Sequence, residues 1–191
     1  MKAGIRVRNS VTRFLQTKLK LKVNEEKGAV DYPSNRKFLG FSYLRTGLGV
    51  KIRISHQSIN RLKNMIRFYT RRTWGISMDE RLKKLNRYLV GWMGYYALTD
   101  DPSILGGITA WMRRRLRVCV WFQWKLGKTR VRKLIALGLR PDKARMAAYI
   151  NRGPWRTSVN PAINTALGND YWSKRGLINL SLKHLEIRKS W

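Results

Sequence analysis

Residues 104–125, with the sequence ILGGITAWMRRRLRVCVWFQWK, form the stretch around which the rest of the chain is organised. Apolar side chains recur along it three and four positions apart, which is the spacing of one helix face. That apolar face consists of Leu105, Ile108, Met112, Leu116 and Cys119. The other side of the same helical wheel carries Arg114, Arg117, Trp121 and Lys125. The pattern predicts a helix that packs one face on a core and exposes guanidinium groups interleaved with an indole.

Two interpretations of the exposed arginines are open. A run of arginines usually marks a solvated helix face. However, guanidinium groups bind phosphate in a bidentate manner, and both arginine planes and indole rings stack on nucleobases. Three further tryptophans lie on or near this region, namely Trp92, Trp111 and Trp124. Because an indole is a poor solvent-facing group, we expect an RNA-facing helix.

The charge balance of the whole chain favours a polyanionic partner. The 191 residues include 41 Lys and Arg against 10 Asp and Glu, for a formal net charge of +31, and 43% are hydrophobic. This hydrophobic content suffices for a folded core, and the cationic excess indicates nucleic acid first and an anionic membrane surface second. No run of about 20 apolar residues and no secretory signal pattern occurs. We expect a cytoplasmic protein of bacterial type that associates with RNA or the nucleoid.

The sequence predicts neither a disulfide nor a metal site. Cys119 is the single cysteine, and neither His56 nor His184 has a second ligand at metal-binding spacing. We therefore expect no cofactor in this chain.

The first part of the chain predicts a helix followed by a small antiparallel sheet. Helical spacing covers residues 7–18, and period-two alternation over 19–23 predicts a strand that leads into a turn at 24–27. A second strand is expected over 37–44, interrupted by Gly40, and a turn at 47–49 leads into a strand over 50–54 that closes a hairpin. Because such a segment cannot bury both faces alone, it resembles the end of a larger domain.

From residue 55 onwards the pattern is helical. A first helix begins near Ser55 or Ser58, and Ser77 with Glu80 forms a capping box at the start of a second. Gly91 and Gly94 in that second helix indicate a place of close approach. Asp100 to Ser103 separate it from the arginine-rich helix, and shorter helices are expected over 129–137 and 141–150.

The fold class expected from these elements is α+β and mainly α. A small N-terminal helix with a β-hairpin precedes a helical bundle, and short helices complete the chain. The expected domains are residues 1–54, 55–126 and 127–191.

These motifs, in this order, resemble the C-terminal part of group II intron reverse transcriptases, also called intron-encoded maturases, over nearly the whole chain. Residues 19–27 (LKLKVNEEK) with 38–41 (FLGF) resemble the last palm block, and residues 55–125 resemble the thumb or maturase-specific domain. Residues 153–156 (GPWR) with Asn160-Pro161 resemble the C-terminal signature. One departure is Gly28, since the family usually has serine after the lysine of the Asn-x-x-Lys turn.

The resemblance implies what is missing as well as what is present. In the family the palm carries three metal-binding aspartates, two of them in Tyr-Ala-Asp-Asp, and polymerase chemistry needs these carboxylates on two divalent ions. Residues 96–101 (YALTDD) mimic this motif, but Leu98 and Thr99 intervene and Pro102 follows. We interpret Asp100 and Asp101 as a helix N-cap pair. Since the chain starts after the place of the catalytic loop, we expect no polymerase activity from it alone, and Mg²⁺ only with the RNA or a complete palm.

The residues expected to contact RNA are basic and aromatic side chains of the helical part. They are Arg71, Arg72, Arg113, Arg114, Arg117, Trp121, Lys125, Lys128, Arg130, Arg132, Lys133, Arg152, Trp155 and Arg156, with Arg115 beside them. Burial of Trp155 as an anchor, and a helix-dipole role for Arg71 and Arg72, are the alternatives. Phe38, Leu39 and Gly40 resemble the primer-grip strand of the family, and in this chain we expect them to lie mostly in the core.

Three functional hypotheses are compatible with the sequence. The first is an RNA-binding maturase-type domain that binds structured group II intron RNA and assists its splicing. The second is a split or truncated reverse transcriptase subunit that completes an active enzyme with a separate fingers and palm chain. The third is a cationic protein of the membrane surface, which the aromatic and basic C-terminal segment argues against; we expect no membrane partner.

Overall fold

The computed structural model describes residues 2–24, 28–47 and 49–191. The chain forms two compact units, Met1–Ser55 and His56–Trp191. The predicted mainly helical α+β fold is confirmed, with a small antiparallel sheet in the first unit and helices throughout the second. The three-part domain organisation stays a prediction.

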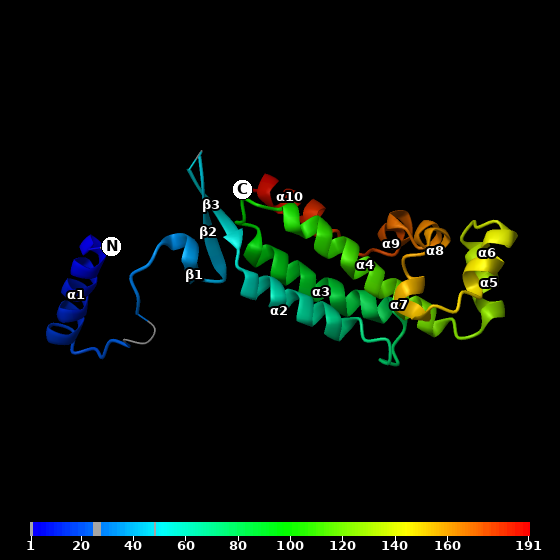
Figure 1. The fold of residues 1–191 in the computed structure, drawn as a ribbon, viewed down its shortest axis with the longest axis horizontal. Helices are drawn as coiled ribbons and strands as arrows, with labels where there is room; N and C mark the ends of the chain where they lie inside the picture. The colour runs from blue at the N-terminus through cyan, green and yellow to red at the C-terminus, as the bar shows by residue number, and fades with distance from the viewer. Residues whose placement is uncertain (1, 25–27, 48) are drawn as a thin grey trace. The chain divides into compact units, whose positions relative to one another are not determined.

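The first unit contains one long helix and a three-stranded sheet (Figure 1). Helix α1 (Lys2–Thr17) is followed by a short 3-10 helix, η1 (Pro33–Asn35). Strands β1 (Lys37–Phe38), β2 (Phe41–Thr46) and β3 (Gly49–Ile54) are antiparallel in the order β1-β2-β3, with Tyr43 opposite Ile52. The predicted hairpin is thus confirmed. Its predicted turn at 47–49 includes Leu48, which lies outside the described residues.

The predicted strand over 37–44 is divided into two. Leu39 and Gly40 have φ angles of 50° and 82°, in the left-handed region, so the chain reverses there and β1 pairs with β2. The reversal places Phe38 and Leu39 at the end of the sheet, where they are 63% and 66% exposed. The expectation that they lie mostly in the core is therefore wrong.

The predicted strand over 19–23 is also wrong. These residues form no regular structure, Lys20 has a φ of 52°, and Leu19 and Leu21 are 52% and 55% exposed. Alternation alone does not make a strand, because a strand needs a neighbour to satisfy its backbone groups. The predicted turn that follows includes residues 25–27, which lie outside the described residues.

Three long helices form the centre of the second unit. Figure 1 shows α2 (His56–Tyr69), α3 (Met78–Tyr96) and α4 (Ser103–Gln123) side by side. Each contributes a buried apolar stripe, and on α4 it includes every residue of the predicted face. The predicted helical bundle is thus present.

Shorter helices complete the second unit. They are α5 (Gly127–Ala136), α6 (Pro141–Ala148), α7 (Gly153–Thr157), α8 (Pro161–Ala166), α9 (Asn169–Lys174) and α10 (Leu180–Lys189). Helix α10 packs on α3 and α4, and α7 packs on α4. In the described parts of the chain, no helix is both long and apolar enough to cross a bilayer.

The helix boundaries follow local capping chemistry. Ser77 Oγ accepts a hydrogen bond from the Glu80 backbone N–H at 3.1 Å, which confirms the predicted cap of α3. The predicted N-cap pair Asp100–Asp101 is wrong, because the N-cap of α4 is Pro102, which makes no side-chain cap hydrogen bond. Asp101 Oδ1 lies one residue earlier and accepts from the Ser103 backbone N–H at 3.3 Å and from the Ser103 hydroxyl at 2.6 Å. The expected close approach at Gly91 and Gly94 is wrong, because a Cβ at either position would meet no atom within 4 Å.

The most deeply buried charge of the chain is Arg81 on α3, which is 1% exposed. Its Nη1 donates to the carbonyl oxygens of Tyr69 and Arg71 at 2.7 and 2.9 Å, and its Nη2 donates to Trp74 at 3.0 Å. These carbonyls belong to the C-terminal end of α2 and the loop after it, where helix geometry leaves oxygens unpaired. Arg81 therefore fixes the path of residues 70–76.

Replacing Arg81 should destabilise the second unit. Arg81→Met removes three donors and leaves buried carbonyls unpaired, so we expect the free energy of unfolding to fall by about 3 kcal/mol. Arg87→Met is the matched control, because Arg87 lies exposed on the same helix. Urea unfolding followed by circular dichroism measures both, and equal losses would contradict this role for Arg81.

Candidate nucleic-acid interface

Several of the predicted RNA-contacting arginines are used inside the protein. Arg117 donates from Nε to the Ser158 carbonyl at 3.0 Å and from Nη1 to the Leu167 carbonyl at 3.4 Å. Burial lowers the pKa of Arg117 to about 10, with smaller contributions from Arg113 and Arg114. Ser158 and Leu167 are the C-terminal caps of α7 and α8, so Arg117 attaches both short helices to α4.

Arg130 and Trp121 form a second internal contact. Arg130 Nε donates to the Trp124 carbonyl at 2.8 Å, and its guanidinium lies 4.7 Å from the centre of the Trp121 ring. Trp121 is only 3% exposed. The expectation that Trp121 lies on the exposed face is wrong, because the chain after α4 folds back over this side of the helix. Arg117 and Arg130 are likewise held by backbone oxygens.

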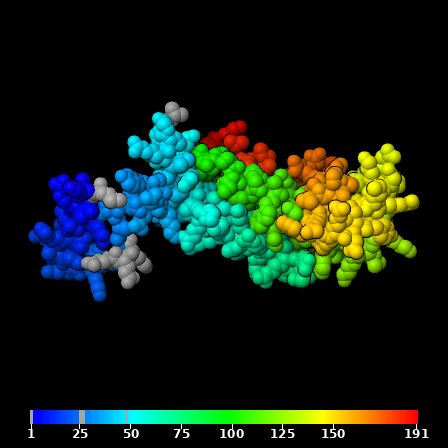
Figure 2. All heavy atoms as spheres, in the orientation of Figure 1, coloured from blue at the N-terminus to red at the C-terminus, as the bar shows by residue number. Residues whose placement is uncertain are grey.

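The remaining arginines gather around a cavity that we call the arginine cleft. It has a volume of about 330 Å³ and is lined by Thr70, Arg71, Arg72, Thr73, Arg115, Val118 and Trp155. The loop after α2, helix α4 and helix α7 each contribute, so segments more than forty positions apart in sequence meet here. Figure 2 shows the yellow and orange segment around α7 beside the green atoms of α4.

Helix α4 also contributes to a neighbouring cavity of about 510 Å³. That neighbouring cavity lies beside Arg113 and Arg117 and includes the carboxylate-bearing Asp170. Burial lowers the pKa of Arg113. Arg113 thus lies next to a carboxylate-bearing cavity, whereas the residues that line the arginine cleft include no acid.

Two contacts fix the side chains of the arginine cleft. The Arg114 guanidinium lies 3.9 Å from the centre of the Trp155 ring, and Arg114 Nη2 donates to the Trp155 carbonyl at 3.2 Å. Arg115 Nε donates to Thr70 Oγ1 at 2.6 Å. Trp155 remains 42% exposed, so the structure holds this indole by one face and leaves part of it open. Its full burial as an anchor is therefore not observed.

Among the described residues, the cations around the arginine cleft have no carboxylate partner. No salt bridge in residues 2–24, 28–47 and 49–191 involves Arg71, Arg72, Arg114 or Arg115. Burial lowers the pKa of Arg115, and the neighbouring Arg67 lowers it further. This like-charge cluster is a site where an anion would relieve repulsion.

A buried thiol contacts Thr70, one of the residues that line the arginine cleft. Cys119 is 1% exposed, and its Sγ lies 3.2 Å from the Thr70 carbonyl oxygen. Burial raises the pKa of this thiol, so it stays protonated at neutral pH.

A second basic cluster lies on α5 and α6. Lys128, Arg132 and Arg145 line a cavity of about 470 Å³ together with the exposed ring of Tyr149. A Cβ at Gly127 would lie 2.5 Å from Tyr149 Cε1, so glycine lets the ring cross the start of α5. The other predicted cations lie exposed nearby or around α7, and these are Lys125, Lys133, Arg152 and Arg156.

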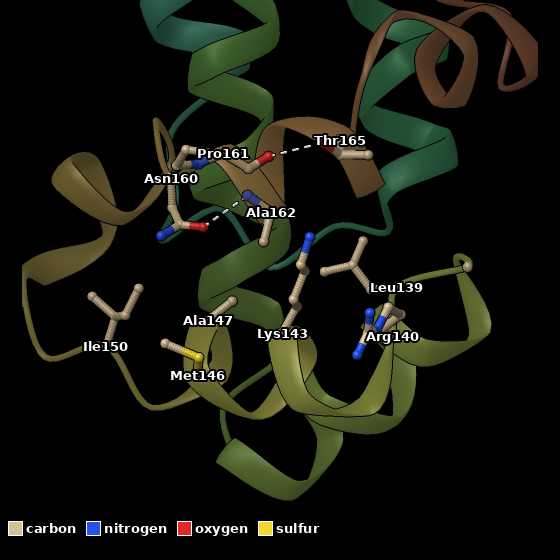
Figure 3. Close-up of a pocket in the computed structure, with 11 residues that line it drawn as sticks. Leu139, Arg140, Lys143, Met146, Ala147, Ile150, Asn160, Pro161, Ala162 and Thr165 are labelled. Atoms are coloured by element: carbon tan, nitrogen blue, oxygen red, sulfur yellow. Dashed lines mark hydrogen bonds between the residues drawn. The ribbon is translucent and has the colours of Figure 1, made fainter.

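A fourth cavity, of about 530 Å³, lies between α6 and α8. Figure 3 shows Lys143 extending into it from α6, with Met146 and Ile150 along one side. Asn160 borders it and caps α8, since its Oδ1 accepts from the Ala162 backbone N–H at 3.0 Å. Two cations line it, Arg140 and Lys143, whereas three arginines line the arginine cleft.

Some residues of these clusters were not predicted from the sequence. Arg67 lies 5.4 Å from the Trp111 ring centre, as does Arg115, so two cations share one indole. Arg67 precedes Arg71 by four positions, and this helical spacing was a usable signal. Arg145 and Tyr149 had no comparable signal, because their proximity to α5 depends on the turn between two helices.

Part of the chain matches a known protein family. Residues 59–136 match the family model of the group II intron maturase-specific domain. A search of curated proteins found no match to the chain. The matched segment covers most of α2 and all of α3, α4 and α5, and it includes Arg71, Arg72 and Arg115 of the arginine cleft.

Substitution of Arg117 should lower the stability more than substitution of Arg113, although both residues lie on α4. Arg117→Met leaves two helix-end carbonyls without donors, and we expect a loss of about 2 kcal/mol in the free energy of unfolding. Arg113→Met is the matched control for a half-buried arginine of the same helix and should cost less, about 1 kcal/mol, which is the centre of the range for point substitutions. Urea unfolding measures both, and a larger loss for Arg113→Met would contradict the assignment.

Proposed function

We propose that this chain, whose residues 59–136 match the model of the group II intron maturase-specific domain, binds structured group II intron RNA and assists its splicing. The observation that carries the proposal is the arginine cleft, where cations without carboxylate partners surround a partly exposed indole. Guanidinium groups bind phosphate oxygens, and aromatic rings stack on bases.

The contribution of the chain is electrostatic and positional. A folded RNA brings phosphates close together, and a protein that neutralises them lowers the cost of that compaction. In such introns the RNA carries out the transesterifications with bound magnesium, so the protein supplies no catalytic group. This role fits an RNA-associated protein of the cytoplasm and requires no membrane.

The salt dependence of RNA binding tests the proposal. We expect the association constant to fall steeply with salt, by roughly 0.7 to 0.9 log units per phosphate contact for each log unit of salt. The double variant Arg71→Gln/Arg72→Gln should reduce the slope by about 2. Titration of labelled intron RNA at several salt concentrations measures it.

A matched double variant controls for net charge alone. Arg175→Gln/Arg188→Gln removes the same charge from arginines that pair with Asp79 and Asp100, so its effect on the slope should be smaller. A wild-type affinity that is nearly independent of salt would contradict the proposal. Splicing of the intron RNA at limiting magnesium then tests whether binding assists the reaction.

A second candidate function is supported by the exposed apolar residues of the first unit. None of the residues of α1 is buried, and Val7, Val11 and Phe14 form a stripe that is 51–63% exposed. Phe38 and Leu39 are also exposed at the end of the sheet. These surfaces support a role as one subunit of a reverse transcriptase, with fingers and palm supplied by another chain.

Reconstitution tests this second function. Mixing the chain with a separate chain that carries Tyr-Ala-Asp-Asp should restore primer extension. Phe38→Ser/Leu39→Ser should weaken it, because apolar contact area is lost. Val50→Ser is the control, since Val50 is similarly exposed on β3. If extension never appears in the mixture, this function is excluded.

A further inference from the structure

We infer that the arginine cleft holds a single unpaired nucleotide of the RNA, with its base on Trp155 and its phosphate among Arg71, Arg72 and Arg115. The inference rests on the proposed function and specifies the RNA feature that the cleft would recognise. It follows from three observations, on the indole, on the cations and on the size of the cleft.

The indole is already positioned for stacking. Arg114 covers one face of the Trp155 ring at 3.9 Å and is held by the Trp155 carbonyl and by Ser158 Oγ. Ser158 Oγ in turn donates to the Trp155 carbonyl at 2.7 Å. Because the ring is fixed by these contacts and is still 42% exposed, a base can stack on it without first ordering the side chain.

The cations surround the position that a phosphate would take. Arg71 and Arg72 are exposed, and their guanidinium groups lie 5.1 Å from the Phe68 ring centre and 5.8 Å from the Phe122 ring centre. The hydrogen bond of Arg115 to Thr70 uses Nε, which leaves its terminal nitrogens for an anion. Arg81 fixes the loop that carries Arg71 and Arg72 through the Arg71 carbonyl.

The shape of the site favours an unpaired nucleotide over a duplex. In an A-form helix the bases are stacked on one another, so a protein ring reaches a base face only where the nucleotide is unstacked. A cavity of about 330 Å³ is at the lower end of the range for small-ligand pockets, which suits one base rather than a helix. The phosphate next to such a base would lie among the arginines.

Two hairpin RNAs of equal length test the inference, one with a single bulged fluorescent adenine analogue and one fully paired. We expect the wild-type chain to bind the bulged hairpin about tenfold more tightly, since stacking of one base contributes roughly 1–3 kcal/mol. Stacking on Trp155 should also quench the analogue. Trp155→Leu, which keeps an apolar side chain but has no aromatic face, should abolish the preference, and Trp155→Phe should retain most of it.

Trp191→Ala is the matched control, because Trp191 is also an exposed tryptophan beside an arginine, Arg188. It should leave the preference for the bulged hairpin unchanged. Equal binding of both hairpins by the wild-type chain, with a steep salt dependence, would overturn the nucleotide site and leave the proposed RNA-binding function intact. Absence of binding to either hairpin and to intron RNA would overturn both.

Discussion

The bond between an arginine guanidinium and a helix-end carbonyl oxygen is the interaction on which this structure depends. A chain with 41 basic and 10 acidic residues cannot neutralise its arginines with carboxylates. The C-terminal end of a helix offers an alternative, because its last carbonyls lack partners and carry the negative end of the dipole. Arg81, Arg117 and Arg130 use this alternative at α2, α4, α6, α7 and α8. The short helices are thereby attached to the bundle by charged donors.

This internal use of arginine divides the basic residues into two groups. The arginines that donate to carbonyl oxygens stabilise the fold, and these contacts partly shield their charge. Those of the arginine cleft are left without carboxylate partners and lie on a surface that three segments build together. The internal group also supports the exposed one, since Arg81 binds the loop that carries Arg71 and Arg72. When an arginine variant loses RNA binding, its stability therefore has to be measured as well, in order to separate a lost RNA contact from a destabilised fold.

Much of the fold could be predicted because its signals are local. The apolar stripe of α4, the Ser77 cap and the β2–β3 hairpin each follow from spacing within one segment. The wrong predictions concern contacts between a segment and parts of the chain that are distant from it in sequence. A helical wheel places Trp121 opposite the core stripe, but only the path of the later chain decides that Arg130 covers it. Likewise, the alternation of apolar and polar residues over 19–23 does not show whether a neighbouring strand is present to pair with this segment.

The types of residue in the candidate site were predicted from the sequence, but only some of the contacts between them were. Arg71, Arg72, Arg114 and Trp155 were identified separately, and the structure brings them to one place. The buried state of the lone thiol has a practical consequence for studying that place. Because Cys119 lies beneath Thr70, maleimide dyes should spare the native chain and modify only a cysteine introduced at the surface. A fluorescent label can then be attached near the cleft through one introduced cysteine, while Cys119 itself stays in place.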